Sequence, residues 1–311
     1  MKMSSSVVAY SFRYFPPLKQ RALAYFSVQR RLRRRPLRSP CTALVTTSLN
    51  ATSFTGNSLF RRMEVMKWIS VIFNSILFYV CIQRFWAGSS IDKNKGMVAH
   101  LKGYGVIQSN KVAEVMETVD RALFVPDGSP AYEDSPMQIG FNATISAPHM
   151  HATCLQLLEK NLLPGMHALD VGSGTGYLTA CFALMVGPQG HAIGVEHIPE
   201  LVAVSIKNVE KSAAAPLLKD GSLALHVGDG REGWPEFAPY DAIHVGAASP
   251  EIPKPLVDQL KPGGRLVIPV GNIFQELKVV DKNEDGSVTV RTETSVRYVP
   301  LTSREAQLRG Y

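Results

Sequence analysis

The stretch Ala168-Leu169-Asp170-Val171-Gly172-Ser173-Gly174-Thr175-Gly176 decides the fold of this chain. An apolar strand runs into three alternating glycines, and an apolar helical segment, 177–185, follows at once. Glycine permits positive φ and carries no Cβ, so the backbone of such a turn can approach a ligand closely. The free N–H groups at the start of the helix face the same place. The turn therefore predicts a site for a nucleoside-containing cofactor.

Strand and helix patterns alternate on the C-terminal side of this turn. The apolar runs predict strands over 166–171, 191–196, 223–228, 240–246 and 264–270, with helices over 177–185, 199–211 and 253–260. Continuous apolar strands separated by helices are typical of a parallel sheet covered on both faces. A turn signal, Asn283–Gly286, joins two further strand-like segments, 276–281 and 287–301, into a hairpin. We expect an α/β, doubly wound, mostly parallel sheet with antiparallel edge strands.

Two helices are expected in front of this sheet. Ser109 can cap a helix whose apolar residues recur at helical spacing on one face, namely Val112, Val115, Met116 and Val119. A second helix, 151–162, leads into the first cofactor strand.

Charge is unevenly distributed along the chain. Residues 1–90 hold fourteen of the 33 Lys and Arg but one of the 26 Asp and Glu, so they carry a net charge of +13 and the remainder −6. The sequence pI of about 9.2 describes this N-terminal segment rather than the rest. The charge therefore gives no support for nucleic-acid binding by the C-terminal part.

The first 63 residues contain no acidic residue and include a basic cluster at 30–38. Such a composition is typical of an organellar transit peptide. A nuclear address, a polyanion-binding patch and a solvated arm remain alternatives. We expect residues 1–92 to be a disordered targeting extension and residues 93–311 to be the catalytic domain.

The segment 68–82 is mostly apolar and is flanked by Lys67 and Arg84. It is shorter than the ~20 residues that span a bilayer, and it has Asn74 and Ser75 at its centre. A membrane span, a signal-type segment in a shorter form and a linker helix all remain open, and we expect no firm membrane span. The expected location is a plastid or mitochondrion, with the cytosol, the nucleus, or the endoplasmic reticulum through 66–86 as alternatives for shorter forms.

The sequence gives no sign of a metal or disulfide site. The four cysteines show no C-x-x-C spacing, and Cys154 and Cys181 lie in apolar helical patterns that favour buried thiols. His149 and His151 could form a metal pair, but no third ligand lies at a useful spacing, so no metal is expected. His244, inside an apolar strand, is expected to be a hydrogen-bonded core residue.

Two acids stand where a nucleoside could be held. Glu196 ends the strand that follows the glycine turn, where a carboxylate can accept both ribose hydroxyls. Asp229, in Gly228-Asp229-Gly230, could receive an adenine amino group, although such a tripeptide can also be a plain turn. The G-x-G-x-G spacing differs from the G-x-G-x-x-G of dinucleotide enzymes, and no triphosphate-binding motif occurs.

Asp170, two residues before the first glycine, suits a cationic group and would repel a pyrophosphate. The arrangement resembles motif I of the Rossmann-like, class I methyltransferases that use S-adenosylmethionine. The loop His244-Val-Gly-Ala-Ala-Ser249 has neither the Pro-rich element of amino-methylating base enzymes nor a Pro-Cys nucleophile. It fits an acceptor that is already nucleophilic, such as a carboxylate. A small-molecule or nucleic-acid methyltransferase, or an NAD-binding protein, are the alternatives.

The segment Asp134-Ser-Pro-Met-Gln-Ile-Gly-Phe-Asn-Ala-Thr-Ile-Ser-Ala-Pro-His-Met-His151 narrows the function. With the blocks 227–231, 240–248, 260–271 and 298–302, it is very similar to protein-L-isoaspartate (D-aspartate) O-methyltransferases, over about 93–308. That resemblance implies methylation of the α-carboxylate of L-isoaspartyl, and also D-aspartyl, residues in aged proteins. The ester then collapses to a succinimide that partly hydrolyses to normal aspartate. It also implies a monomer.

The resemblance further implies individual roles. Ser146 would be the catalytic residue that orients the acceptor carboxylate, although from the residues alone it could also be a helix cap before Pro148. The substrate would also contact Val245, Gly246 and Ala247. S-adenosyl-L-methionine, and its product S-adenosyl-L-homocysteine, would be held by Ala143, Thr144, Ile145, His151, Asp170, Gly172, Ser173, Gly174, Glu196, His197, Asp229, Gly230 and Thr302. Glu196 replaces the aspartate often found there in animal members.

Overall fold

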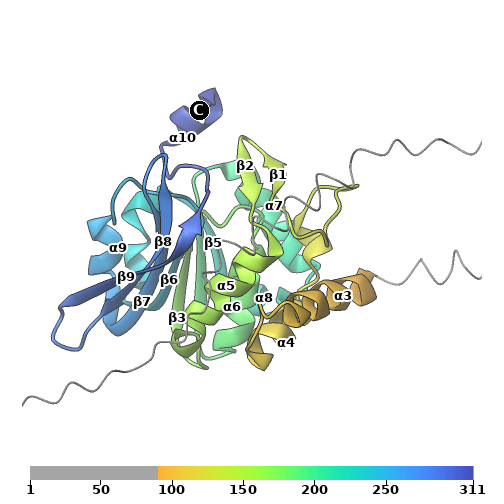
Figure 1. Cartoon of the computed structure of the whole chain (residues 1–311), viewed down its shortest axis with the longest axis horizontal. Helices are drawn as coiled ribbons and strands as arrows, with labels where there is room; N and C mark the ends of the chain where they lie inside the picture. Colours follow the sequence, from red (N-terminus) through yellow and green to blue (C-terminus); the bar gives the residue numbers. More distant parts are fainter. Residues whose placement is uncertain (1–89, 311) are drawn as a thin grey trace, which may run out of the picture. The chain divides into compact units, whose positions relative to one another are not determined.

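The computed structural model describes residues 90–310 (Figure 1). The predictions on the basic arm, on segment 68–82 and on most of the expected 1–92 extension lie outside the described residues. Within residues 90–310, none of the helices combines the length and apolar character that crossing a bilayer requires.

One seven-stranded sheet lies at the centre, in the order β5-β4-β3-β6-β7-β8-β9 (Figure 1). The pairs among β3 to β7 are parallel, whereas β8 and β9 are antiparallel to their neighbours. The strands are β3 (His167–Val171), β4 (His191–Glu196), β5 (Leu223–Val227), β6 (Tyr240–Val245), β7 (Leu260–Val270), β8 (Gln275–Lys282) and β9 (Val288–Val296). This confirms the predicted fold class. The strand order reverses between β3 and β6, and ligands bind outside the carboxyl ends of strands at such a point.

Alternate residues of the strands belong to two separate apolar cores. Ala168 packs with the helices α5 (Pro148–Leu158), α6 (Tyr177–Val186), α7 (Pro199–Glu210) and α8 (Ala215–Asp220). Leu169 and Val171 belong to the second core, with α9 (Lys254–Asp258) and the 3-10 turn η4 (Pro235–Phe237). A strand that is buried on both faces needs apolar residues throughout, which explains the continuous runs in the sequence.

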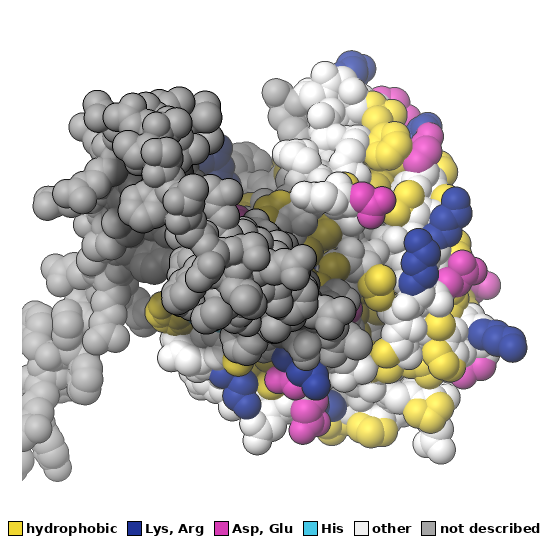
Figure 2. Space-filling model, turned by 90° about the vertical axis from the view of Figure 1, so that its right-hand side faces the viewer, with side chains coloured by type: hydrophobic (Ala, Val, Ile, Leu, Met, Phe, Trp, Pro, Cys, Tyr) yellow, Lys and Arg dark blue, Asp and Glu magenta, His cyan; other side chains and the backbone are white. Residues whose placement is uncertain are grey.

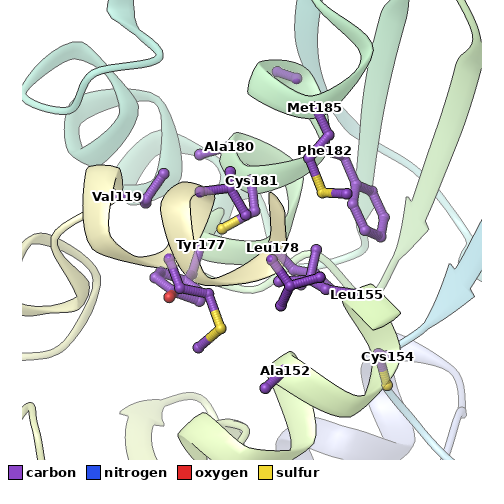
Figure 3. Packing of buried hydrophobic residues seen from close by; sticks show 14 of the residues in the cluster. Val119, Ala152, Cys154, Leu155, Tyr177, Leu178, Ala180, Cys181, Phe182 and Met185 are labelled. Carbon is purple, nitrogen blue, oxygen red and sulfur yellow. The ribbon is translucent and has the colours of Figure 1, made fainter. Parts of the chain in front are cut away.

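The added N-terminal helices pack on the first core. In α4 (Asn110–Thr118) the predicted apolar residues are buried, and Ser109 caps the helix by accepting the N–H of Val112 at 3.3 Å. Helix α3 (Ser90–Gly103) packs on α4, and α4 packs on α5 and α6. Figure 3 shows Cys154 and Cys181 among the apolar side chains of this core, and both are buried free thiols, as expected.

Several element boundaries differ from the predictions. Helix α5 begins at Pro148, before the expected residue 151, because proline has the φ that a first helical position needs, and it ends at Leu158. Helix α9 ends at Asp258, because β7 begins at Leu260 rather than at 264. The last strand ends at Val296 rather than at 301. Sequence patterns also missed α3, α8, the hairpin of β1 (Met137–Gly140) and β2 (Ala143–Ile145), and α10 (Arg304–Arg309).

Candidate active site

The glycine turn after β3 brings three strand ends together through their backbones. Gly172, Gly174 and Gly176 have φ of +73°, +54° and +89°, conformations that favour glycine. The N–H of Gly246, after β6, donates to Val171 O at 2.7 Å. A Cβ on Gly230, after β5, would lie 2.5 Å from a methyl group of Val171. Larger residues at Gly230 or Gly246 would press on the glycine turn and separate the strand ends that form the cleft.

A cleft with two lobes opens at this edge of the sheet. The larger lobe has an empty volume of about 520 Å³ and the smaller about 370 Å³. The larger is lined by Ile139, Ala143, Thr144, Gly172, Gly174, Val195, Glu196, His197, Gly230, Gly246, Ala247, Val299, Pro300, Leu301, Thr302 and Gln307. The smaller is lined by Ile139, Thr144, Ile145, Ser146, His151, Asp170, Gly172, Ser173, Gly174, Thr175, Tyr177, Leu178, His244 and Gly246. Shared residues make the lobes parts of one site.

The β1–β2 hairpin and α10 border the larger lobe. Gln307 of α10 donates from Nε2 to Phe141 O at 3.0 Å, and its own carbonyl accepts from Asn142 at 2.7 Å. Its Oε1 also lies 2.9 Å from Nε2 of His197. Gln307 thus ties the tip of the hairpin and the C-terminal helix to the wall of the lobe.

Glu196 is buried at the end of β4, as the spacing from the glycine turn predicted. Its two carboxylate oxygens accept the N–H groups of Gly174 and Ile198, each at 3.1 Å. Burial raises the pKa of Glu196, although these N–H groups oppose the shift. Each oxygen keeps a free lone pair, so the carboxylate can still accept from hydroxyl groups in the larger lobe.

Asp170 and His244 form a buried pair in the smaller lobe. Asp170 Oδ2 accepts from Thr179 at 2.6 Å. Burial opposes protonation of His244, but Cys154 and the hydrogen bond to Asp170 outweigh it and raise the pKa of His244 to about 10. The prediction of a hydrogen-bonded core histidine is confirmed for its burial, but His244 also lines the smaller lobe.

Ser146 lies between β2 and α5, at the edge of the smaller lobe. The cap residue of α5 is Ala147, and it makes no side-chain cap bond, so Ser146 is not the helix cap. Its side chain lies near that of Tyr298, whose pKa is raised well above the ordinary value by burial. Its carbonyl accepts from the buried Arg121 at 2.8 Å. Ser146 lines the smaller lobe, so its hydroxyl can contact a ligand there.

The two histidines of α5 have different surroundings. His149 Nδ1 lies 2.8 Å from Asp134, whose carboxylate also accepts the His149 N–H at 2.9 Å. His151 is buried in the smaller lobe, and burial together with the charges of Arg121 and His244 lowers its pKa well below the usual value. Among the residues with described side chains, no group of three possible metal ligands occurs.

Fifteen of the predicted site residues line the cleft, and two do not. Asp229 is bound by both Nε and Nη2 of Arg231, and it is not among the described residues that line either lobe. Val245 is fully buried in the second core, so its side chain points away from the cleft. Val245 can contribute to a substrate site only through its backbone.

Sequence reasoning missed three polar residues around the lobes. Arg121 lies in the 3-10 turn η1 (Arg121–Phe124), and a single buried arginine leaves no periodic signal. Tyr298 lies in the segment 298–302, in which the family resemblance implied a role for Thr302 alone. Gln307 lies in a short C-terminal helix without a distinctive pattern. Their places depend on contacts between segments far apart in sequence, such as the 166 positions between Phe141 and Gln307.

The arrangement can hold a ligand that carries both a positively and a negatively charged group. Asp170 offers a carboxylate to a cation, and Ser146, Ser173 and His151 can offer donors to an anion. The Ser173 hydroxyl is buried without a hydrogen-bond partner in the described structure, which marks it as a group awaiting a ligand. Among the described residues that line the two lobes, there is no lysine or cysteine. The site therefore favours positioning over covalent catalysis by the protein.

Comparisons with known proteins find strong matches to this chain. Residues 92–306 match the family model described as Protein-L-isoaspartate(D-aspartate) O-methyltransferase (PCMT). Protein-L-isoaspartate O-methyltransferase 1 of Arabidopsis thaliana is 74% identical over 229 residues, which cover 74% of this chain and 100% of that protein. The protein-L-isoaspartate O-methyltransferase of Caenorhabditis elegans is 47% identical over 221 residues, 70% of this chain and 96% of that protein.

A solved structure from Plasmodium falciparum matches this chain over almost the whole length of the Plasmodium protein. It is described as a protein-L-isoaspartate O-methyltransferase in complex with S-adenosyl-L-homocysteine. The TM-score is 0.63 at 34% identity, and the match covers 67% of this chain and 98% of that one. The residues matched by the family model, 92–306, include the whole seven-stranded sheet.

Proposed function

This chain belongs to the protein-L-isoaspartate(D-aspartate) O-methyltransferase family, and from that premise we propose a specific activity for it. It transfers a methyl group from S-adenosyl-L-methionine to the free α-carboxylate of L-isoaspartyl, and also D-aspartyl, residues in damaged proteins. The observation that carries the proposal is the single cleft in which fifteen of the expected residues meet. Peptides and proteins with isoaspartyl residues are its partners.

The lining residues fit the methyl donor. Glu196, His197 and Thr302 line the larger lobe, where a carboxylate suits ribose hydroxyls. Asp170 and Ser173 in the smaller lobe suit the ammonium and carboxylate of an amino acid, and the free Ser173 hydroxyl supports this fit. When bound, S-adenosyl-L-methionine supplies an electrophilic methyl group on a sulfonium. Asp229 is held by Arg231 and is not among the described residues that line either lobe, so it would contribute less.

Ser146 is the residue to which we assign the acceptor carboxylate. A carboxylate is already ionised at neutral pH and needs no base, so the protein has to hold its oxygen in line with the methyl group. The Ser146 hydroxyl and the backbone of Gly246 and Ala247, which all line the cleft, provide that hold. Positioning of this kind supplies ~7 to 11 kcal/mol of barrier lowering.

Radiolabelled methyl donor tests the activity on two matched peptides, one isoaspartyl and one with normal aspartate. We expect base-labile label on the isoaspartyl peptide alone. Equal labelling of the two peptides, or no labelling of either, would contradict the proposed substrate. Binding of NAD without binding of S-adenosyl-L-homocysteine would contradict the cofactor.

The N-terminal segment and the oligomeric state belong to the same proposal. The family match begins at residue 92, which supports a separate targeting extension in front of the enzyme. On the face drawn in Figure 2, the described Lys and Arg side chains are interspersed with Asp and Glu, which supports a catalytic part without nucleic-acid affinity. We propose a monomer in a plastid or mitochondrion, which sedimentation and sequencing of the mature N-terminus would test.

A further inference from the structure

Arg121 is a buried guanidinium directly behind the smaller lobe. Its side chain is fully buried, its Nε donates to Ala131 O at 2.9 Å, and Tyr177 lies beneath it with its ring centre 5.7 Å away. Among the described side chains, no carboxylate lies within ion-pair distance of it. A buried charge without a counter-ion is unfavourable unless hydrogen bonds and nearby charges compensate it.

The contact between Arg121 and His151 settles which nitrogen of His151 carries the proton. Nη1 of Arg121 lies 3.2 Å from Nδ1 of His151. A guanidinium can only donate, so Nδ1 must accept, and the proton of the neutral ring is on Nε2. The third hydrogen bond of the Arg121 side chain, from Nη2 to Ser146 O, places the same residue behind the acceptor site.

The edge of the His151 ring that carries Nε2 lies away from Arg121, and the ring lines the smaller lobe. No described atom accepts from Nε2. Ser173 contributes a second unpartnered donor to the same lobe. Two donors in front of a buried cation favour an anion beside them, whereas Asp170 in the same lobe is the group that suits a cation.

We propose that Arg121 is a positioning residue that fixes His151 as the Nε2–H tautomer, so that His151 and Ser173 donate to a carboxylate in the smaller lobe. The inference rests on the proposed function, which supplies two ligands with a carboxylate. These are the amino-acid end of the methyl donor and the α-carboxylate of the isoaspartyl residue. Arg121 acts through His151 in either case.

Nitrogen NMR of the full chain with labelled histidine tests the tautomer in the wild-type protein. We expect His151 to carry its proton on Nε2 and none on Nδ1, with the signals assigned by their loss in His151→Gln. Arg121→Met should mix the two tautomers, whereas Arg121→Lys, which still donates, should retain Nε2–H. A proton on Nδ1 of wild-type His151 overturns the proposal.

A matched control separates this role from general destabilisation. Arg265 also binds a backbone carbonyl, that of Leu157 at 2.8 Å, but it does not line the cleft. Arg265→Met should leave the His151 signals and the affinity for S-adenosyl-L-homocysteine unchanged. If Arg265→Met shifts the His151 tautomer as Arg121→Met does, the effect is structural and the proposal is wrong.

Binding measurements distinguish the two carboxylates. If the lobe holds the carboxylate of the methyl donor, Arg121→Met lowers the affinity for S-adenosyl-L-homocysteine by about tenfold to a hundredfold. The affinity for its decarboxylated analogue then falls much less. If it holds the isoaspartyl carboxylate, affinity for S-adenosyl-L-homocysteine is kept and KM for the peptide rises by a similar factor. Unchanged constants in a folded Arg121→Met protein overturn the proposal. A wild-type chain without methyl transfer would overturn the proposed function instead.

Discussion

Asp170 Oδ1 lies 2.9 Å from Nδ1 of His244, and both side chains are buried at the base of the smaller lobe. The pair joins the end of β3 to the end of β6, where the strand order reverses. A charge-assisted hydrogen bond of this kind is stronger in a buried site than in water. The pair therefore connects the stability of the fold to the charge of the cofactor site.

The pH dependence of stability tests the pair. The pKa of His244 is raised to about 10 from an ordinary 6.5, so its contribution is complete below pH 6.5 and is lost as the pH rises toward 10. Through this window, stability should fall by about 1.4 kcal/mol per pH unit from this group. Urea unfolding of the wild type and His244→Gln at pH 7, 8 and 9 measures the difference. An identical pH slope in both proteins would show that His244 does not titrate there.

Ser146→Ala should impair turnover more than cofactor binding. Removal of a hydroxyl that orients a charged acceptor should lower kcat by about tenfold to a hundredfold. Steady-state rates and calorimetry with S-adenosyl-L-homocysteine measure the two effects. Ser212→Ala, at the end of α7 and outside the cleft, is the matched control and should change neither. Equal losses of turnover and affinity would make Ser146 a cofactor residue.

The carboxylates of Glu196 and Asp229 should differ in their effect on cofactor affinity. Both Glu196→Ala and Asp229→Ala are expected to weaken the binding of S-adenosyl-L-homocysteine. Glu196→Ala should do so more, by about tenfold or more, because Glu196 lines the larger lobe and Asp229 is held by Arg231. Calorimetry on the two variants measures this. Unchanged affinity in either variant removes that residue from the cofactor site.

The Ser109 cap should contribute measurably to stability. Its hydroxyl accepts from Val112 and donates to Glu159 at 2.6 Å, which ties α4 to the end of α5. Ser109→Ala should lower the free energy of unfolding by about 1 kcal/mol. Thr118→Ala, at the exposed end of the same helix, should change it by less than about 0.5 kcal/mol. Equal effects of the two substitutions in denaturant unfolding would contradict the assignment of the cap.

Local patterns predicted the parts of the fold that depend on periodicity and turn chemistry. The spacing of Val112 and Val115 marked a buried helix face, and Asn283–Gly286 marked the β8–β9 turn, where Gly286 has φ of +83°. The hairpin over the cleft escaped prediction because its turn uses positive φ at Phe141 and Asn142, and phenylalanine rarely adopts that conformation.

The site residues were predicted where a motif fixes the backbone, as at Gly172 and Glu196. The prediction was less complete where a neighbouring residue binds the side chain, or where the alternation along a strand turns the side chain away from the cleft. Asp229 has a guanidinium two residues away, and Val245 points to the second core because side chains alternate along a strand. Arg121 could not be found, since its role depends on His151, thirty positions later in the chain.

Repair itself gives the most direct test of the central claim. One purified isoaspartyl peptide is incubated with the full chain and S-adenosyl-L-methionine. The peptide forms are separated over time, and their molecular masses are measured. The account predicts a transient gain of one methyl group, then the succinimide, and then accumulation of the normal aspartyl peptide. An isoaspartyl peptide that stays unmethylated while the protein binds the methyl donor would contradict the account.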